Sequence, residues 1–337
     1  RRGGRSPGNT RAGRPSPRGM FPVPWHPSRT FHEEVGRWYD AVGEVLAPRL
    51  FPAGPIVLLQ VDNEASYYFR DAAYEQDYHP DALAQWRRFL ERRYGTVEKA
   101  AEAHRASYGR WDDCAPPERF RAETPSELAV HLDWGAFRED LITGALAKMR
   151  RRLAKAGLKN VVTVHNFPLG EQGVPMSSTA IESVVDLVGF DYYHARREHR
   201  TIKRRTLYLA GTHRVPYAPE LGIGAPAWFT PLANEDSLFT AMTALAYGLR
   251  GFNLYMAVDR DRWYGAPIDP RGNPRVEAGT WKQLLSAMDR VGFHALARRA
   301  EVGLMMPREY ARLSRATSLL GALSPTVLEA IGGTPVE

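Results

Sequence analysis

The chain has 337 residues but a single cysteine, Cys114, so it can form neither an internal disulfide nor a cysteine-based zinc site. It contains no apolar run of about 18 residues, which excludes a membrane-spanning helix. No glycine-rich phosphate loop follows a predicted strand, so nothing supports a nucleotide-binding sheet. The scarcity of cysteine is compatible with a cytoplasmic protein, and we expect that compartment.

Acidic residues are absent from the first 18 positions, which carry six arginines. The net charge of the whole chain is +7, and without those six arginines it falls to +1, so we expect no nucleic-acid partner. Residues 1–20 are rich in glycine, proline and arginine and offer no apolar face, which predicts a disordered segment. The chain starts without methionine, and we expect its natural N-terminus to lie upstream.

Beyond this segment, helical and strand-like patterns alternate. Apolar residues recur at helical spacing in five segments: 32–46, 80–94, 126–156, 236–249 and 278–298. Short apolar runs typical of buried strands lie at 56–61, 160–166, 184–193, 214–220 and 251–256. This alternation predicts a parallel sheet. Five strands suffice for an open doubly wound sheet, whereas a closed barrel needs eight. A further strand-like run at 301–307 predicts that residues 300–337 begin a second domain.

The clearest chemical signal is Gln60-Val61-Asp62-Asn63-Glu64, at the end of the first predicted strand. A carboxylate at the C-terminal end of a buried parallel strand lies where α/β barrels carry their catalytic groups. The alternative is an ordinary polar loop that happens to follow a strand. This segment alone does not decide between the two.

A second carboxylate, Glu220, lies at the end of the strand predicted at 214–220, just before a glycine-containing turn. Glycosidases need two carboxyl groups that flank the scissile bond. Alone, Glu220 is more simply a salt-bridged loop residue. Because strands of one sheet can bring their ends together, Glu64 and Glu220 in combination favour catalysis.

Residues 60–64 resemble the acid/base strand of β-galactosidases in glycoside hydrolase families 35 and 42, which belong to a clan of retaining barrel enzymes. The resemblance implies that Glu64 is the general acid/base, that Asn63 binds the sugar 2-hydroxyl, and that Glu220 is the nucleophile. Residues 89–96 are similar to family 42, and residues 262–275 resemble the loop after strand eight in family 35. By this resemblance, residues 21–299 form strands four to eight of a (β/α)8 TIM barrel that lacks its first three strands.

Aromatic and amide residues complete the predicted site. The resemblance implies that Tyr192 or Tyr193 hydrogen-bonds the nucleophile, and since adjacent strand residues point to opposite faces, only one is expected to face the pocket. Trp263 and Tyr264 offer flat faces for a sugar ring, with Tyr264 favoured, and Asn166 ends a strand where it can line the cleft. Each of these residues could instead serve only in packing.

We therefore predict a retaining hydrolase of terminal β-galactosides that requires neither a metal nor an organic cofactor. One alternative is an inactive barrel remnant that acts as a carbohydrate-binding module or scaffold. Another is a β-glycosidase of different specificity. Because open sheet edges invite association, we expect this chain alone to oligomerise or dissolve poorly and to hydrolyse an aryl β-galactoside weakly or not at all.

Overall fold

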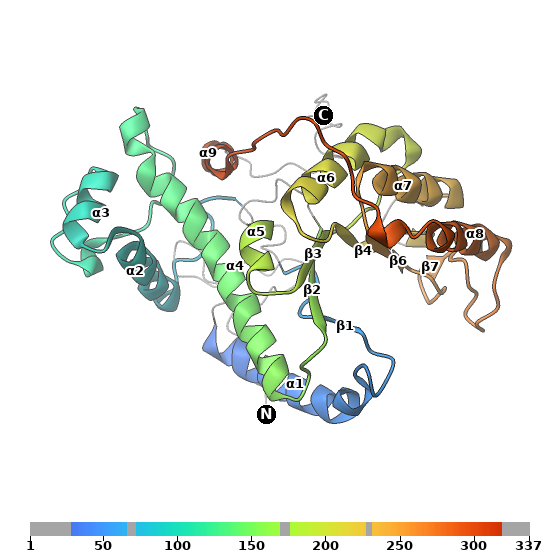
Figure 1. Ribbon diagram of the computed structural model, residues 1–337. Helices are drawn as coiled ribbons and strands as arrows, with labels where there is room; N and C mark the ends of the chain where they lie inside the picture. The colour runs from blue at the N-terminus through green and yellow to red at the C-terminus, as the bar shows by residue number, and fades with distance from the viewer. Residues whose placement is uncertain (1–27, 66–71, 169–175, 227–230, 319–337) are drawn as a thin grey trace.

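The computed structural model describes residues 28–65, 72–168, 176–226 and 231–318. Its centre is a parallel sheet of five strands in the order β1-β2-β3-β4-β6 (Figure 1). The strands are β1 (Leu58–Gln60), β2 (Val162–Phe167), β3 (Leu187–Phe190), β4 (Tyr217–Gly222) and β6 (Gly251–Tyr255). Within the described residues β1 and β6 do not pair, so the sheet is an open arc. The predicted incomplete TIM barrel of five parallel strands is confirmed. The segment predicted to be disordered, residues 1–20, lies outside the described residues.

Helices cover the arc and bury its strands. They are α4 (Ala129–Lys155), α5 (Ser178–Glu182), α6 (His199–Thr212), α7 (Asn234–Tyr247) and α8 (Val276–Arg290), and α1 (Arg29–Leu46) packs on α4. One core joins these layers, with Leu146 of α4, Phe190 of β3 and Leu209 of α6 fully buried. Burial of β2, β3 and β4 explains why these strands read as apolar runs in the sequence, whereas the outer strands β1 and β6 are only partly buried. Shorter elements are η1 (Ala47–Arg49), η2 (Trp111–Asp113), η3 (Pro125–Glu127), η4 (Arg196–Glu198), η5 (Phe293–Ala295) and the antiparallel pair β5 (Ala225–Pro226) and β7 (Trp263–Tyr264).

Between β1 and α4 the chain forms a small helical unit that lies at the left of Figure 1. It contains α2 (Pro80–Tyr94) and α3 (Val97–His104), and its separate core includes Trp86 and Trp134. Arg138 of α4 forms a fully buried ion pair with Asp77 at 2.9 Å and also donates to the carbonyl oxygen of Ala72 at 3.0 Å. These contacts anchor residues 72–77, which lead into α2.

The prediction of a strand at 301–307 is wrong. This segment has no strand structure, and Val302, Leu304 and Met305 are 84–89% exposed. Within the described residues its backbone pairs with no strand, and an apolar run without such a partner does not form a strand. Helix α9 (Arg308–Thr317) follows and packs on α4, where Arg308 and Arg312 pair with the buried Glu139. Residues 319–337 lie outside the described residues, and a second domain at 300–337 stays a prediction.

Candidate active site

Three carboxyl groups meet at the C-terminal ends of neighbouring strands. Glu64 lies four residues beyond β1, Asp191 directly follows β3, and Glu220 lies within β4. One oxygen atom of each lies within 4.8 Å of the corresponding atoms of the other two. Parallel pairing of β1 with β2, β2 with β3, and β3 with β4 brings these strand ends to one edge of the sheet. The structure thus brings together the two glutamates predicted from the sequence.

Two neutral donors hold the Glu220 carboxylate. The Tyr193 hydroxyl donates to Oε2 at 2.5 Å, and Nδ2 of Asn166 donates to Oε1 at 3.2 Å. Burial raises the pKa of Glu220 above its ordinary value, and the Tyr193 hydrogen bond opposes that rise. Donors aimed at both oxygens favour the ionised form. This environment suits a carboxylate that must carry charge in a largely buried place.

Glu64 is held at its backbone and has a different electrostatic environment. Its backbone N–H donates to Oδ1 of Asn166 at 2.9 Å, and its φ of 48° lies in the left-handed region. Burial, reinforced by the negative charge of Glu220, raises the pKa of Glu64 to about 7. Two carboxyls whose surroundings favour different protonation states are what an acid and a nucleophile require.

Asn166 of β2 connects the components of this site. Besides its bonds to Glu220 and Glu64, its Nδ2 donates to Oδ2 of Asp191 at 3.0 Å and its Oδ1 accepts from Nε2 of Gln60 at 2.8 Å. The same Gln60 amide donates to Oδ1 of Asn63 at 2.9 Å. Asn166 therefore lies within the site, as predicted, and the exposed Asn63 lies at its edge.

Three other predicted residues are located as follows. Tyr192 is fully buried on the opposite side of the strand from Tyr193, with its hydroxyl 3.0 Å from Oγ1 of Thr206, so it does not reach the carboxyls. Trp263 is only 2% exposed and donates to the Ile223 carbonyl oxygen at 2.8 Å, which makes it a packing residue without a free ring face for a sugar. Tyr264 is 62% exposed and keeps an accessible ring.

Asp191 is the site residue that sequence reasoning missed. It lies in Gly189-Phe190-Asp191-Tyr192-Tyr193, a segment in which only the two tyrosines were predicted to be functional. Its signal was the same one that identified Glu64 and Glu220, a carboxylate at the C-terminal end of a buried strand.

A trio of clustered carboxyls can also suggest a cation site. Here the three carboxyl oxygens lie within 4.8 Å of one another in a largely buried place, where three negative charges repel strongly, so at least one carboxyl holds a proton. A bound metal would have to displace that proton. We therefore interpret the trio as an acid–base cluster.

Among the described helices, none is long and apolar enough to cross a membrane.

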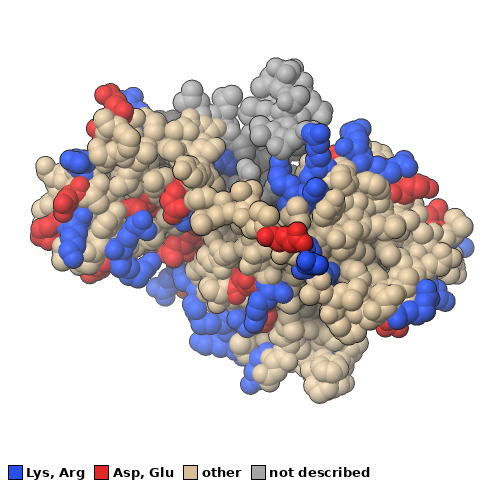
Figure 2. Space-filling view, turned by 45° about the horizontal axis from the view of Figure 1, so that its top comes forward, with Lys and Arg blue, Asp and Glu red and all other residues tan. Residues whose placement is uncertain are grey.

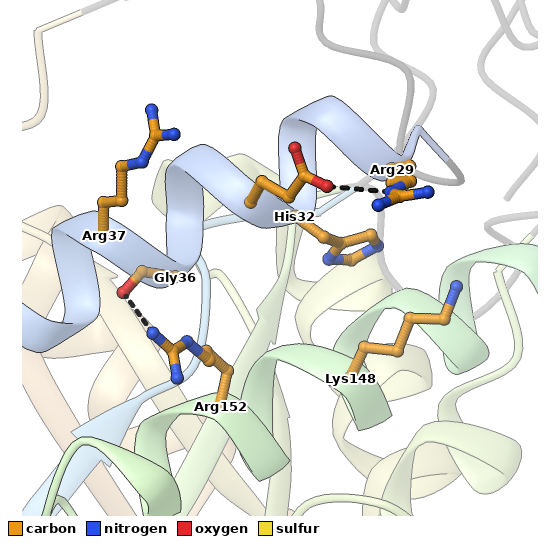
Figure 3. Close-up of a pocket in the computed structure, with 7 residues that line it drawn as sticks. Arg29, His32, Gly36, Arg37, Lys148 and Arg152 are labelled. Atoms are coloured by element: carbon orange, nitrogen blue, oxygen red, sulfur yellow. Dashed lines mark hydrogen bonds and ion pairs between the residues drawn. The ribbon is translucent and has the colours of Figure 1, made fainter.

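A hollow lined by basic residues lies elsewhere, between α1 and α4 (Figure 3). Its arginines are paired with acids: Arg29 with Glu33, Arg37 with Glu34, and Arg152 with Asp40. Because these pairs neutralise most of the charge, the hollow is not an evident anion site. On the face shown in Figure 2, acidic side chains likewise lie among the basic ones.

Comparison with known proteins relates this geometry to a family. The family model of β-galactosidase, glycoside hydrolase family 42, matches residues 9–217, a range that includes Glu64 and Asp191 and ends three residues before Glu220. The crystal structure of the β-galactosidase from the psychrophilic Marinomonas ef1 has a TM-score of 0.70 at 16% identity, covering 92% of this chain and 52% of that one. This likeness concerns the fold.

Two curated relatives have other activities. A β-1,2-glucosyltransferase of Ignavibacterium album is 23% identical over 260 residues, which is 73% of this chain and 35% of the relative. An exo-β-D-glucosaminidase of Thermococcus kodakarensis is 28% identical over 153 residues, 42% of this chain and 18% of the relative. The chain thus spans about half or less of each of these proteins. The likeness of residues 262–275 to family 35 stays a prediction. With the family model matching well over half of its residues, the chain belongs to glycoside hydrolase family 42.

Proposed function

We propose that this chain carries the catalytic carboxyls of a retaining glycosidase that acts on terminal β-galactosides. The observation that supports this most directly is the approach of Glu64 and Glu220, whose nearest oxygens lie within 4.8 Å. Retaining enzymes hold their carboxyl groups about 5–5.5 Å apart, whereas inverting enzymes leave about 6.5–9.5 Å for a water molecule. The short separation favours direct attack by a carboxylate.

In this proposal Glu220 is the nucleophile. Its oxygens accept hydrogen bonds from Tyr193 and Asn166, which keep the carboxylate ionised and oriented. It attacks the anomeric carbon, and a covalent bond forms between that carbon and a Glu220 oxygen as the glycosidic bond breaks.

Glu64 is the general acid and then the general base. With a pKa of about 7, a large fraction of Glu64 is protonated at neutral pH and can give its proton to the leaving oxygen. The resulting Glu64 carboxylate then takes a proton from water, which attacks the anomeric carbon and releases Glu220. The product keeps the β configuration.

A second candidate is transfer of a glucosyl or related unit to another sugar. The β-1,2-glucosyltransferase named above favours it, because it matches 73% of this chain. The same covalent intermediate serves both reactions, and only the acceptor differs: a sugar hydroxyl in place of water. A third candidate, an inactive remnant, follows from the open arc of five strands.

The decisive assay compares aryl β-galactoside, β-glucoside and β-glucosaminide, with and without a sugar acceptor. It is done with the 337-residue chain. Proton NMR of the first-formed product gives its anomeric configuration. We expect β-galactose from the galactoside. Initial release of the α-anomer would contradict a retaining mechanism, and preferred turnover of a glucoside with an acceptor would favour the transferase.

Azide rescue separates the roles of the two glutamates. In Glu220→Ala, azide should replace the nucleophile and yield the α-glycosyl azide. In Glu64→Ala, azide should attack the covalent intermediate and yield the β-glycosyl azide. The reverse pattern would exchange the two assignments.

A further inference from the structure

Asp191 is buried in the centre of the carboxyl cluster, and the mechanism proposed above leaves it without a role. Its side chain is only 2% exposed. One of its oxygens lies within 4.8 Å of an oxygen of Glu64 and of Glu220. Three negative charges at such separations in a buried place repel one another strongly. At least one of the three carboxyls must therefore hold a proton.

Hydrogen bonding indicates which carboxyl holds it. The Asp191 and Glu64 carboxyls have oxygens within 4.8 Å of each other, and a hydrogen bond between two carboxyl groups requires a proton on one of them. Glu220 already has two neutral donors, Tyr193 and Asn166. Asp191 has fewer donors: its Oδ2 accepts from the Asn166 amide at 3.0 Å, and its buried Oδ1 accepts no hydrogen bond from any donor among the described residues.

The groups that surround Asp191 come from every neighbouring element. They are Glu64 after β1, Asn166 of β2, Tyr193 just beyond β3, Glu220 of β4 and Arg205 of α6. The Arg205 guanidinium binds the Asp191 backbone carbonyl oxygen at 2.5 Å. Burial, followed by the charges of Glu220 and Glu64, raises the pKa of Asp191 to about 10, in agreement with the geometry.

We propose that Asp191 keeps its proton at neutral pH and donates a hydrogen bond to Glu64. As a positioning residue it acts through Glu64 and does not touch the substrate. Its O–H stabilises the Glu64 carboxylate that forms when Glu64 gives up its proton, and thereby supports the change of Glu64 from acid to base. Because Asp191 stays neutral, it adds no third charge beside Glu220. The link to catalysis rests on the proposed function, whereas the protonation state of Asp191 does not.

The test is carbon-13 NMR of the full 337-residue chain with labelled aspartate and glutamate carboxyls, titrated from about pH 5 to about pH 8. Asp191→Asn and Glu64→Gln assign the two signals. We expect the Asp191 signal to stay at the frequency of a protonated carboxyl throughout, while the Glu64 signal titrates within the range. An Asp191 signal at the frequency of an ionised carboxylate would overturn the proposal.

Substitutions test the positioning role through the titration midpoint of Glu64. Asp191→Asn keeps a neutral donor and should leave the midpoint close to that of the unmodified chain. Asp191→Ala removes the donor and should raise the midpoint, since the Glu64 carboxylate loses a hydrogen bond. If Asp191 is instead ionised, Asp191→Asn removes a negative charge and should lower the midpoint by about one pH unit or more, which would overturn the proposal.

The conservative variant decides the question even if Asp191→Ala does not fold. The NMR readout also needs no turnover, so it is independent of the activity assay. Initial release of the α-anomer by a chain in which Asp191 is protonated would refute the retaining mechanism and leave the protonation state established. Retention of configuration by a chain in which Asp191 is ionised would support the mechanism and overturn the protonation state.

Discussion

Tyr192 and Tyr193 are adjacent in the chain, but their hydroxyls reach different parts of the molecule. Tyr193 donates to Glu220 at 2.5 Å, and Tyr192 lies 3.0 Å from the Thr206 hydroxyl in the core. Alternation along an extended strand produces this difference. It makes the pair a matched test of one hydrogen bond.

We predict that Tyr193→Phe raises the pKa of Glu220 further, because the carboxylate loses its shorter hydrogen bond. A hydrogen bond to a charged group contributes about 1.5–3 kcal/mol, or about 1–2 pH units. The acidic limb of the kcat/KM profile should move up by that amount. Tyr192→Phe should leave the profile unchanged, and equal shifts in both variants would remove Tyr193 from its assigned role.

The carboxyl cluster should also make the protein less stable as pH rises. The pKa of Asp191 goes from 3.8 to about 10 on folding and that of Glu64 from 4.5 to about 7, so the folded state binds protons that the unfolded state releases. The contribution of these two carboxyls to the free energy of unfolding is therefore fully present below about pH 4. It is lost as the pH rises towards about 10, by up to about 1.4 kcal/mol per pH unit for each proton.

Asp191→Asn should flatten this dependence, and urea unfolding at a series of pH values measures it. An unchanged slope would show that Asp191 is not protonated preferentially in the folded state. Exposed acids such as Glu34 provide the control, since Glu34→Gln should leave the slope as it is.

At this scale the sequence predicted much of the site. Glu64, Glu220, Asn166 and one tyrosine of the pair were predicted to lie together, because strand ends are recognisable and parallel strands bring them to one edge, and the structure has them there; their roles stay predictions. The sequence predicted neither the place of Asp191 in the site nor the burial of Trp263. The first depends on which side chains lie next to Asp191 in the folded chain, and the second on how the loop after β6 folds over Ile223.

Among the elements, α4 carries the contacts that fix residues 72–77, which precede α2. Arg138 and Asp77 have side chains that are only 1% and 0% exposed, so their ion pair is desolvated. Removing one partner of such a pair leaves a buried charge uncompensated.

Arg138→Met should destabilise the chain by about 3–5 kcal/mol, measured by urea unfolding. A matched control is the exposed pair of Arg92 with Asp140 at 2.9 Å, which joins α2 to α4. Arg92→Met should cost less than about 1 kcal/mol. Similar losses in the two variants would mean that burial does not distinguish the pairs.

The sequence predicted elements well where the periodicity was strong, as in α2, which starts at Pro80 and ends before Gly95. Helix α6 was missed, because its arginines and lysine obscure an apolar face on which Ile202, Thr206 and Leu209 are buried. The opposite error occurred at 301–307. An apolar run there predicted a strand, but strand formation depends on a partner that the sequence pattern cannot specify.

Across the whole molecule, the open arc leaves β1 and β6 each with a free edge within the described residues. Large apolar side chains are exposed, among them Trp38 of α1 at 66% and Val57, which directly precedes β1, at 60%. Free edges and exposed apolar groups favour association.

We therefore predict that the 337-residue chain self-associates in sedimentation velocity experiments, with a concentration-dependent mass. Val57→Lys should reduce association by placing a charge beside the β1 edge. Met242→Lys changes an equally exposed apolar residue on α7, 55% exposed, and should have no such effect. A chain that stays monomeric at high concentration would contradict this prediction.

The central claim is that Glu220 forms the covalent bond to the sugar, and a trapping experiment tests it most directly. An activated 2-deoxy-2-fluoro-β-galactoside forms a glycosyl-enzyme that hydrolyses slowly, and trypsin then separates the three carboxyls into different peptides. Glu64 falls in residues 50–70, Asp191 in 160–196 and Glu220 in 215–250. Mass spectrometry of the treated chain should find the added sugar on Glu220. A label on Glu64 or Asp191, or no label in a form that turns over β-galactosides, would contradict the assignment.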